Sequence, residues 1–262
     1  MLYLQRLSVF LFSAHLRSLY DILIFLLLLI FRTMWMQYPG TESMYGMDDQ
    51  YLIGANLLVK PITAPGVEET DVYFPGNDIW YDAETLQLVS DKAPEDGYEK
   101  SKVMCPIDDG VPVFQRGGSI LPRKLRLRRS AKLMKADPYT LFVALDANKK
   151  ASGNLYMDDE ETFTHFTSSS YAEANFSADF SSPSATISNS ASIGDGWIDQ
   201  ALTMSTNRAI ERIIIMGVEQ EPKSIAQDGD EIYFHYDAET RLLVLRKPYV
   251  SALLDWELAV TF

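Results

Sequence analysis

The sequence predicts a mainly β fold beyond residue 40, on three observations. After Gly40 the apolar runs are short, and they are separated by residue types that favour turns. Several of these runs alternate apolar and polar residues, as half-buried strands do. No long stretch repeats apolar residues at helical spacing. An all-β architecture is therefore expected for most of the chain.

The first group of predicted strands precedes residue 122. These strands are Tyr51–Ile53, Asn56–Ile62, Asp71–Phe74, Ile79–Tyr81, Val111–Gln115 and Ser119–Leu121. Between the third and fourth lies Pro75-Gly76-Asn77-Asp78, whose residues accept tight-turn dihedral angles, so a hairpin is predicted there. Gly117 and Gly118 separate the last two, where a bulge or tight corner explains them without a ligand.

The second group of predicted strands fills the chain after residue 138. They are Tyr139–Asp146, Gly153–Met157, Thr162–Thr167, Tyr171–Phe180, Ala209–Gly217, Glu231–Tyr236, Leu242–Arg246 and Trp256–Phe262. Within Thr162–Thr167, apolar and polar side chains alternate. The Ser-rich stretch Ser181–Ser192 is predicted to be a loop, because strand patterns resume beyond it.

A basic segment lies between the two groups and predicts a domain boundary. Seven Lys or Arg occur in the thirteen residues Arg123–Lys135. One interpretation is an anion-binding or membrane-surface patch. The other is an edge or linker strand, because alternation in Arg126-Leu127-Arg128 places the charges on one face and leucine on the other. The alternation favours the edge strand.

The N-terminus contains an apolar run of a different kind. Ile22–Phe31 is ten uninterrupted apolar residues, whereas a membrane-spanning helix needs about 20. The run fits three interpretations: a signal-peptide core, a membrane tether, or a buried segment whose packing partners lie outside this chain. The short length and the lack of a small-residue cleavage site favour the buried segment.

Composition excludes several classes of function. The formal net charge of −13 argues against a nucleic-acid partner, which requires clustered cations to neutralise phosphates. Cys105 is the single cysteine, so neither an intrachain disulfide nor a cysteine-based zinc site is available. The three histidines show no metal-ligand spacing, and no phosphate-binding glycine loop occurs, so no cofactor is expected.

The sequence contains carboxyl pairs but no convincing catalytic pair. They are Asp48-Asp49, Asp108-Asp109, Asp158-Asp159 and Glu160-Glu161. Glycoside hydrolysis needs two carboxyl groups that face each other across the bond, and neighbours along a strand point to opposite faces. No catalytic residue is therefore assigned from these pairs. Acidic residues in turns more often accept backbone hydrogen bonds.

Two further signals concern sugars. The aromatic residues Tyr73, Phe74, Trp80 and Tyr81 could stack on sugar rings, although core packing is the commoner role of strand aromatics. Asn175-Phe176-Ser177 is an acceptor sequon, and it predicts a glycosylation site at Asn175 if the chain enters the secretory pathway.

Several ordered segments resemble the C-terminal part of family 31 glycoside hydrolases. They are Arg32–Ile62, Val72–Asp82, Val111–Ser130, Met134–Asp146, Gly153–Phe163, Leu243–Pro248 and Asp255–Phe262. The resemblance implies a (β/α)8 catalytic barrel followed by two β-sandwich domains. It thus implies an incomplete barrel end at residues 1–47, a proximal β-sandwich at 48–129 and a distal one at 130–262. Asp48, Asp49 and Gln50 match a motif at the barrel exit, where the resemblance implies a structural role.

The resemblance also implies an activity for the parent protein. Members of the matching branch are retaining α-glucosidases that trim glucose from N-linked glycans in the endoplasmic reticulum. Their implied partners are the catalytic barrel of the same chain, an accessory β subunit and the N-linked glycan. The family's nucleophile lies in a Trp-x-Asp-Met-Asn-Glu motif and its acid in a Trp-x-Gly-Asp-Asn motif. Neither motif occurs in this sequence, so no catalytic residue is carried over.

Two function hypotheses follow. The chain is either the C-terminal portion of an α-glucosidase, inactive by itself, or a free-standing β-sandwich module that binds glycans or a partner protein. The second version includes a membrane tether through Ile22–Phe31. The resemblance is weak at its N-terminal end, because this chain has Arg32-Thr33 where the family has Arg-Pro. Surfaces that pack on the barrel in the family are expected to lie exposed in this chain.

Overall fold

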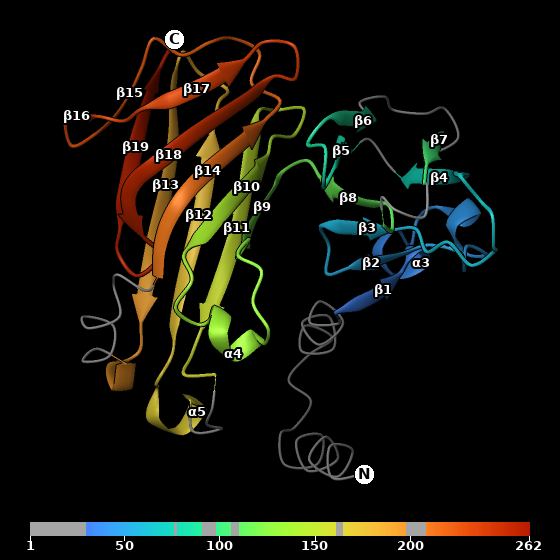
Figure 1. Cartoon of the computed structure of the whole chain (residues 1–262), viewed down its shortest axis with the longest axis horizontal. Helices are drawn as coiled ribbons and strands as arrows, with labels where there is room; N and C mark the ends of the chain where they lie inside the picture. Colours follow the sequence, from blue (N-terminus) through green and yellow to red (C-terminus); the bar gives the residue numbers. More distant parts are fainter. Residues whose placement is uncertain (1–29, 76–77, 91–97, 106–109, 161–164, 198–207) are drawn as a thin grey trace.

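The described part of the protein is mainly β-strands, which form two bodies that lie side by side (Figure 1). The computed structural model describes residues 30–75, 78–90, 98–105, 110–160, 165–197 and 208–262. Within these ranges helical structure is limited to single turns, such as α3 at Met34–Gln37 and η1 at Glu42–Met44. The predicted mainly β fold is confirmed.

The N-terminal body combines a six-stranded antiparallel sheet with a two-stranded ribbon. The sheet order is β1 (Phe31–Thr33), β2 (Tyr51–Ile53), β3 (Leu57–Val59), β8 (Val113–Arg116), β5 (Trp80–Asp82) and β6 (Leu88–Ser90). The ribbon pairs β4 (Glu69–Pro75) with β7 (Tyr98–Met104). Apolar side chains from both fill one core, where the rings of Phe74 and Phe114 meet edge to face at 4.9 Å. This burial is the main stabilising term for so small a body.

The predicted hairpin at Pro75-Gly76-Asn77-Asp78 is wrong. β4 pairs with β7, which lies more than twenty residues later, whereas β5 pairs with β6 and β8. The turn residues therefore connect two different sheets. Turn chemistry identifies where a chain reverses or bends, but the strand that becomes the hydrogen-bonded neighbour is decided by non-local packing.

The C-terminal body is a single sheet of eleven strands that curls around its own core (Figure 1). Its order is β16 (Asp230–Glu231), β15 (Ser224–Gln227), β19 (Trp256–Thr261), β13 (Ser184–Ile193), β12 (Ala172–Asp179), β11 (Lys150–Met157), β9 (Ser119–Arg123), β10 (Tyr139–Ala144), β14 (Ala209–Met216), β18 (Leu242–Ser251) and β17 (Phe234–Asp237). β10 and β14 run parallel, and most other pairs are antiparallel. The inward side chains of both halves form one large core.

The burial patterns of β12 and β10 show which faces of the eleven-stranded sheet are covered. β12 alternates buried and exposed residues along its length, so one of its faces meets solvent. β10 is buried at every position. Its inner residues Leu141 and Val143 join the large core, whereas Phe142 and Ala144 pack against the N-terminal body. The uninterrupted burial of β10 therefore reflects cover on both faces.

The second half of the chain corrects two predictions. Residues 184–193 of the Ser-rich stretch are not a loop but form β13, whose Ala185 and Ile187 are buried. His165–Ser168 form the helical turn α5, so the strand predicted through Thr167 is wrong there; residues 162–164 lie outside the described part. In β13 small polar residues carry little intrinsic strand preference, and tertiary packing decides.

The basic segment is not an edge strand. β9 ends at Arg123, and residues 124–130 form an irregular segment that leads into the helical turn α4, Ala131–Met134. Leu127 is 99% exposed, so no strand neighbour covers it. Arg128 donates two hydrogen bonds to the carboxylate of Asp137, at 2.9 and 2.6 Å, and this pair fixes the course of the segment.

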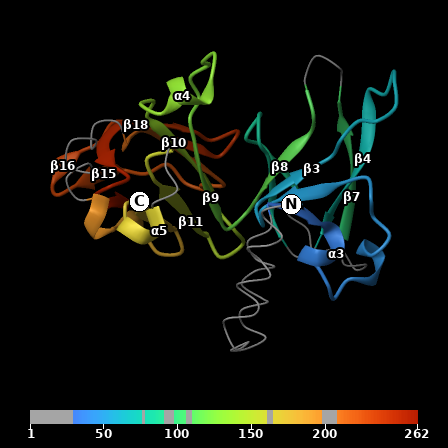
Figure 2. The ribbon, with the colours of Figure 1, turned by 90° about the horizontal axis from the view of Figure 1, so that it is seen from below.

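Figure 2 shows the two bodies side by side, connected through β8 and β9. Gly117 and Gly118 make the tight corner between these strands, as predicted, and Gly118 has a φ of 84° that favours glycine. β9 already belongs to the eleven-stranded sheet. The domain limits of 1–47, 48–129 and 130–262 remain predictions, as does the barrel remnant.

Of the apolar N-terminal run, only Ile30 and Phe31 belong to the described part of the chain. Residues 22–29 lie outside the described part of the chain, and Ile30 and Phe31 are both 67% exposed. Across the described residues, no helix combines the length and apolar character needed to cross a bilayer.

Candidate functional site

The predicted barrel-exit motif lies at the surface of the N-terminal body, just before β2. Asp48 and Asp49 are exposed, whereas Gln50 is 2% exposed. The Gln50 side-chain amide donates to the carbonyl oxygen of Tyr73 at 2.7 Å and accepts from the Tyr73 backbone N–H at 3.0 Å. Gln50 thus pairs with the β4 backbone as a strand residue would, and it ties the motif to the ribbon.

Asp49 has a charged partner from the neighbouring strand end. Its carboxylate forms an ion pair with the ammonium group of Lys60, a side chain that is 6% exposed. A buried ammonium without a partner would be costly, so this carboxylate accounts for the burial of Lys60. This ion pair gives Asp49 a stabilising role, and no catalytic role is needed to explain the residue.

The contact between the two bodies contains a buried polar site that the sequence did not predict. The Tyr81 hydroxyl of β5 donates to the carbonyl oxygen of Leu145 at 2.9 Å. Gln115 of β8 is 1% exposed, and its side-chain amide donates to Phe142 O at 3.0 Å and to Ser119 O at 3.2 Å. A buried amide within an apolar strand was the signal available in the sequence.

Close backbone approach also shapes this contact. Gly217 follows β14 with a φ of 87°, and a Cβ atom there would lie 2.4 Å from the Tyr81 hydroxyl oxygen. Gly117 is also tightly enclosed, since its Cβ would lie 3.0 Å from the carbonyl oxygen of Leu145. At Gly117 and Gly217 the absence of a side chain therefore lets the two bodies approach each other closely.

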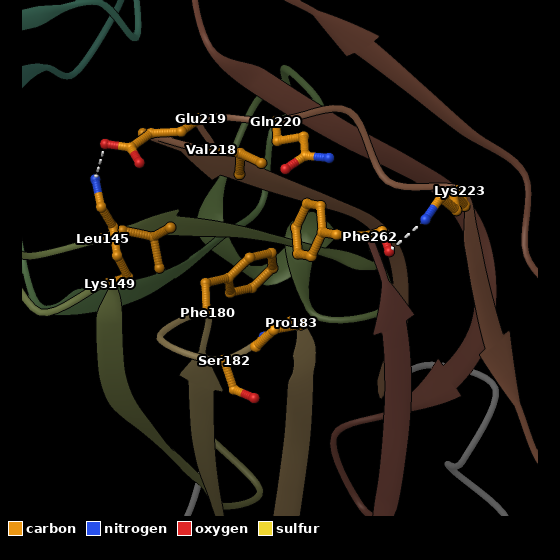
Figure 3. Close-up of a pocket in the computed structure, with 11 residues that line it drawn as sticks. Leu145, Lys149, Phe180, Ser182, Pro183, Val218, Glu219, Gln220, Lys223 and Phe262 are labelled. Carbon is orange, nitrogen blue, oxygen red and sulfur yellow. Dashed lines mark hydrogen bonds and ion pairs between the residues drawn. The ribbon is translucent and has the colours of Figure 1, made fainter.

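A separate pocket of about 380 Å³ opens at the rim of the C-terminal body (Figure 3). Phe180 and Phe262 meet there with ring centroids 6.2 Å apart. On one side Lys149 and Glu219 form an ion pair at 2.7 Å. On the other, Lys223 donates to the Phe262 backbone oxygen at 2.9 Å. The pocket thus combines an aromatic floor with a charged rim.

The described residues that line this rim pocket do not include the pair of carboxyl groups that hydrolysis needs. The hydrogen bond from Lys149 lowers the pKa of the Glu219 carboxyl, so this group is ionised at neutral pH and cannot serve as a general acid. Among the described residues that line the pocket, Glu219 supplies the single carboxylate side chain. Glycoside hydrolysis ordinarily needs two.

Other predicted residues are now placed. Phe74, Trp80 and Tyr81 are 1%, 0% and 3% exposed, so they serve packing, as favoured, and cannot stack on a sugar. Asn175 is exposed on β12, and its glycosylation remains a prediction. His165 and His235 lie on different elements, and His15 lies outside the described residues. Within the described ranges no group of three or more acidic, His or Cys side chains could hold a metal ion.

Comparisons with known proteins place the chain in a family. The model of the glycosyl hydrolase family 31 C-terminal domain matches residues 28–121. The chain is 36% identical to neutral alpha-glucosidase AB of Homo sapiens over 235 residues, which cover 87% of this chain and 23% of the human protein. It is 32% identical to a probable glucan 1,3-alpha-glucosidase of Arabidopsis thaliana over 247 residues, covering 88% of this chain and 24% of that protein.

Solved structures give the same result at the level of the fold. A crystal structure of a glucosidase II alpha subunit, bound to DNJ, superposes with a TM-score of 0.72 at 26% identity, covering 88% of this chain and 26% of that one. An ER glucosidase II heterodimeric complex, of the catalytic subunit with the binding domain of the regulatory subunit, matches with a TM-score of 0.71 at 27% identity. It covers 88% of this chain and 25% of the matched chain.

This chain spans about a quarter of the length of the relatives it matches. The similarity runs through both β-bodies, because most of the chain is covered in each comparison. The resemblance inferred from the sequence motifs is confirmed. The chain therefore belongs to glycoside hydrolase family 31, as part of its C-terminal β-rich region.

Proposed function

We propose that this chain is the C-terminal portion of an α-glucosidase that removes glucose from N-linked glycans in the lumen of the endoplasmic reticulum. The observation that carries the proposal is the match to a glucosidase II alpha subunit over 88% of the chain with a TM-score of 0.72. The 36% identity to neutral alpha-glucosidase AB supports the same substrate class.

The role of this portion is to support a catalytic barrel. Phe31, Trp35 and Tyr45 are 67%, 48% and 57% exposed. Trp35 and Tyr45 line a shallow depression together with Pro39. Clustered exposed aromatic residues mark a surface that another body covers, and we assign that cover to the barrel of the parent chain. Asp48, Asp49 and Gln50 then anchor the connection that leaves the barrel.

Two further partners belong to the proposal. One is a regulatory β subunit, on the model of the heterodimeric glucosidase II complex that this chain resembles. The other is the N-linked glycan, which the barrel would bind and cleave. By itself the chain is inactive in this proposal, because it lacks the family's two catalytic carboxylate motifs.

An activity assay tests the inactivity of the isolated chain. Purified residues 1–262 should release no product from an aryl α-glucoside, whereas an intact neutral alpha-glucosidase assayed in parallel should. Turnover that disappears on a single substitution, Asp48→Asn or Asp49→Asn, would contradict the proposal, because it would place a catalytic carboxylate in this chain.

A chimera tests the supporting role. Residues 32–262 would replace the corresponding C-terminal region of a neutral alpha-glucosidase AB. The expected result is a chimera that still releases glucose from a glucosylated N-glycan, because the barrel regains a matching support. A chimera that folds but leaves the glycan intact, while the unmodified enzyme cleaves it, would contradict the proposed supporting role.

A further inference from the structure

A row of arginines crosses the outer face of the eleven-stranded sheet, where β9, β10, β14 and β18 lie side by side (Figure 1). The members of this arginine row are register partners: Arg123 of β9, Thr140 of β10, Arg212 of β14 and Arg246 of β18. Two residues further along their strands, Phe142 and Ile214 pack against the N-terminal body. Residues two apart on a strand share a face. The arginine row therefore lies beside the contact between the two bodies.

Two members of the row, Arg212 and Arg246, lie directly opposite each other on paired strands. Like charges at such positions repel, and the two backbones are only about 5 Å apart. Arg246 is exposed and Arg212 is half-buried, and neither side chain forms an ion pair or hydrogen bond with a described residue. Stability alone does not explain this arrangement. A partner that brings negative charge would remove the repulsion.

The centre of the row holds a polar group of a different kind. Thr140 is 0% exposed, and its hydroxyl oxygen has no hydrogen-bond partner among the described residues. A buried hydroxyl without a partner is costly. A carboxylate that binds between Arg123 and Arg212 would supply an acceptor beside it. This observation does not depend on charge, and it indicates the same kind of ligand.

The carboxylates near the row do not neutralise it. Two are already paired with other cations, Glu211 with Arg126 at 2.9 Å and Asp137 with Arg128 at 2.6 Å. The remaining described carboxylates lie at its borders: Asp82, Glu84, Asp158, Asp159, Glu160 and Glu231. None of the three arginines of the row forms an ion pair with a described carboxylate. The row is therefore a local positive surface on a chain whose formal net charge is −13.

Exposed apolar side chains accompany this positive charge. Leu127, which follows Arg126, is 99% exposed, and Tyr249 is 89% exposed in the part of β18 that bulges opposite Glu211. Within this bulge Lys247 and Tyr249 both have a positive φ, of 52° and 58°, a strained conformation that is common at functional sites. The ion pair of Arg126 with Glu211 joins the basic segment to the bulge. A small anion would use the charges alone, whereas a polypeptide could also cover the apolar side chains.

We propose that the arginine row, together with Leu127 and Tyr249, is a docking surface for an acidic segment of a partner polypeptide. Carboxylates of that segment bind between the three arginines, whose guanidinium groups match carboxylates in geometry. An apolar side chain of the segment packs on Leu127. A nucleic acid or a membrane fits less well, because an extended polyanion would also meet the acidic remainder of the chain.

This inference does not rest on the proposed function. The surface assigned to the catalytic barrel contains Trp35 and Tyr45 of the N-terminal body, whereas the arginine row belongs to the C-terminal body. Failure of one assignment would therefore leave the other standing.

Fluorescence anisotropy of a labelled peptide tests the surface on the full chain. The peptide repeats the unit Glu-Glu-Leu, and a matched peptide repeats Gln-Gln-Leu. We expect saturable binding of the Glu peptide with a Kd of about 10 μM at low salt, weaker binding as salt is raised, and no saturable binding of the Gln peptide. Arg246→Glu should weaken binding roughly tenfold, and Leu127→Ser about threefold.

The matched control is Arg241→Glu, which makes the same charge change at an exposed arginine just before the same strand. It should leave the Kd unchanged within error. Because Arg246→Glu places a carboxylate opposite Arg212, it should raise the midpoint of thermal unfolding while it weakens binding. Arg212→Gln gives a second test, since it removes one charge of the row without reversing it.

Several outcomes would overturn the proposal. They are absence of saturable binding of the Glu peptide, equal binding of both peptides, and equal weakening by Arg241→Glu and Arg246→Glu. Binding that Leu127→Ser leaves unchanged would contradict a polypeptide occupant, because a simple anion site would then suffice. Sedimentation of the chain with phosphatidylserine vesicles, abolished by Arg246→Glu, would also overturn it, because the occupant would then be a membrane.

Discussion

At the residue scale, a few buried polar side chains serve as connectors between backbones. Gln50 joins the segment before β2 to β4, and Gln115 joins β8 to β10. Each side-chain amide forms hydrogen bonds with backbone groups of another segment. Such a group is costly when it is buried without a partner. Replacing either glutamine should therefore lower the free energy of unfolding.

The first prediction concerns Gln50. Gln50→Leu removes both hydrogen bonds to the Tyr73 backbone while keeping a buried side chain of similar size, so the free energy of unfolding should fall by roughly 1–3 kcal/mol. Urea unfolding of the variant and of the unchanged chain measures the difference. Asp48→Asn, at an exposed neighbour, should leave the midpoint within error. Equal effects of both substitutions would contradict the connector role of Gln50.

The second prediction concerns pH and the Arg128–Asp137 pair. Hydrogen bonds from Arg128 lower the pKa of the Asp137 carboxyl, helped by the charge of Arg126 and opposed by desolvation. Because the pKa is lower in the folded state, the pair stabilises the fold above the ordinary carboxyl pKa of about 4, and this stability is lost as pH falls through the folded value.

Arg128→Ala tests this dependence. The difference in unfolding free energy between the unchanged chain and the variant should be largest near neutral pH and should shrink on acidification below about pH 4. Chemical unfolding at a series of pH values measures it. Arg129→Ala, which removes the next arginine, serves as the control. A difference that stays constant down to acidic pH would refute the assigned pKa shift.

At the element scale, the burial pattern of a strand reflects how many of its faces are covered. β12 alternates and has one solvent face, whereas β10 is buried throughout because the N-terminal body covers its second face. The sequence predicted both strands but not this difference in cover. It also failed for β13, where Ser and Asn gave no strand signal although Ala185 and Ile187 face the core.

The third prediction concerns the contact between β5 and the end of β14. Gly217→Ala would place a Cβ atom 2.4 Å from the Tyr81 hydroxyl oxygen, so the variant should lose roughly 2–4 kcal/mol through steric overlap and the strain of a positive φ. Tyr81→Phe removes the hydroxyl oxygen with which the added Cβ atom would overlap. The double variant should therefore recover part of the loss, as measured by a double-mutant cycle in urea.

The recovery should be partial, because the backbone at Gly217 keeps its φ of 87°. Gly229→Ala provides the control: its φ is 95°, but nothing lies within 4 Å of its added Cβ. It should show backbone strain alone and no coupling to Tyr81→Phe. Additive effects of Gly217→Ala and Tyr81→Phe would refute the close contact between the two bodies.

At the scale of the whole molecule, the N-terminal body ends in an aromatic surface without a described neighbour in this chain. Trp35 and Tyr45 are 48% and 57% exposed on adjoining elements, and Phe31 is 67% exposed. Such a surface fits the proposed barrel contact. In the isolated chain it should promote self-association, since apolar surface gains by leaving water.

The fourth prediction tests this surface directly. The double variant Trp35→Ser and Tyr45→Ser should lower the apparent mass at high concentration and reduce binding of an apolar dye. Light scattering after size exclusion and dye fluorescence provide the two measurements. The control replaces Tyr233 and Tyr249, which are 73% and 89% exposed elsewhere, by Ser. Equal changes in the control would show that exposure alone, and not this surface, drives association.

The sequence by itself determined the mainly β class, most strand positions and the family, because short alternating runs, turn residues and ordered motifs are local features. It misjudged the basic segment, which it favoured as an edge strand, and the pairing of β4, since pairing depends on residues far apart in the chain. Only the tertiary structure decided that Gln50 and Gln115 connect backbones and that β10 is covered on both faces. These features exist only where separate segments meet, and no local pattern specifies which segments will do so.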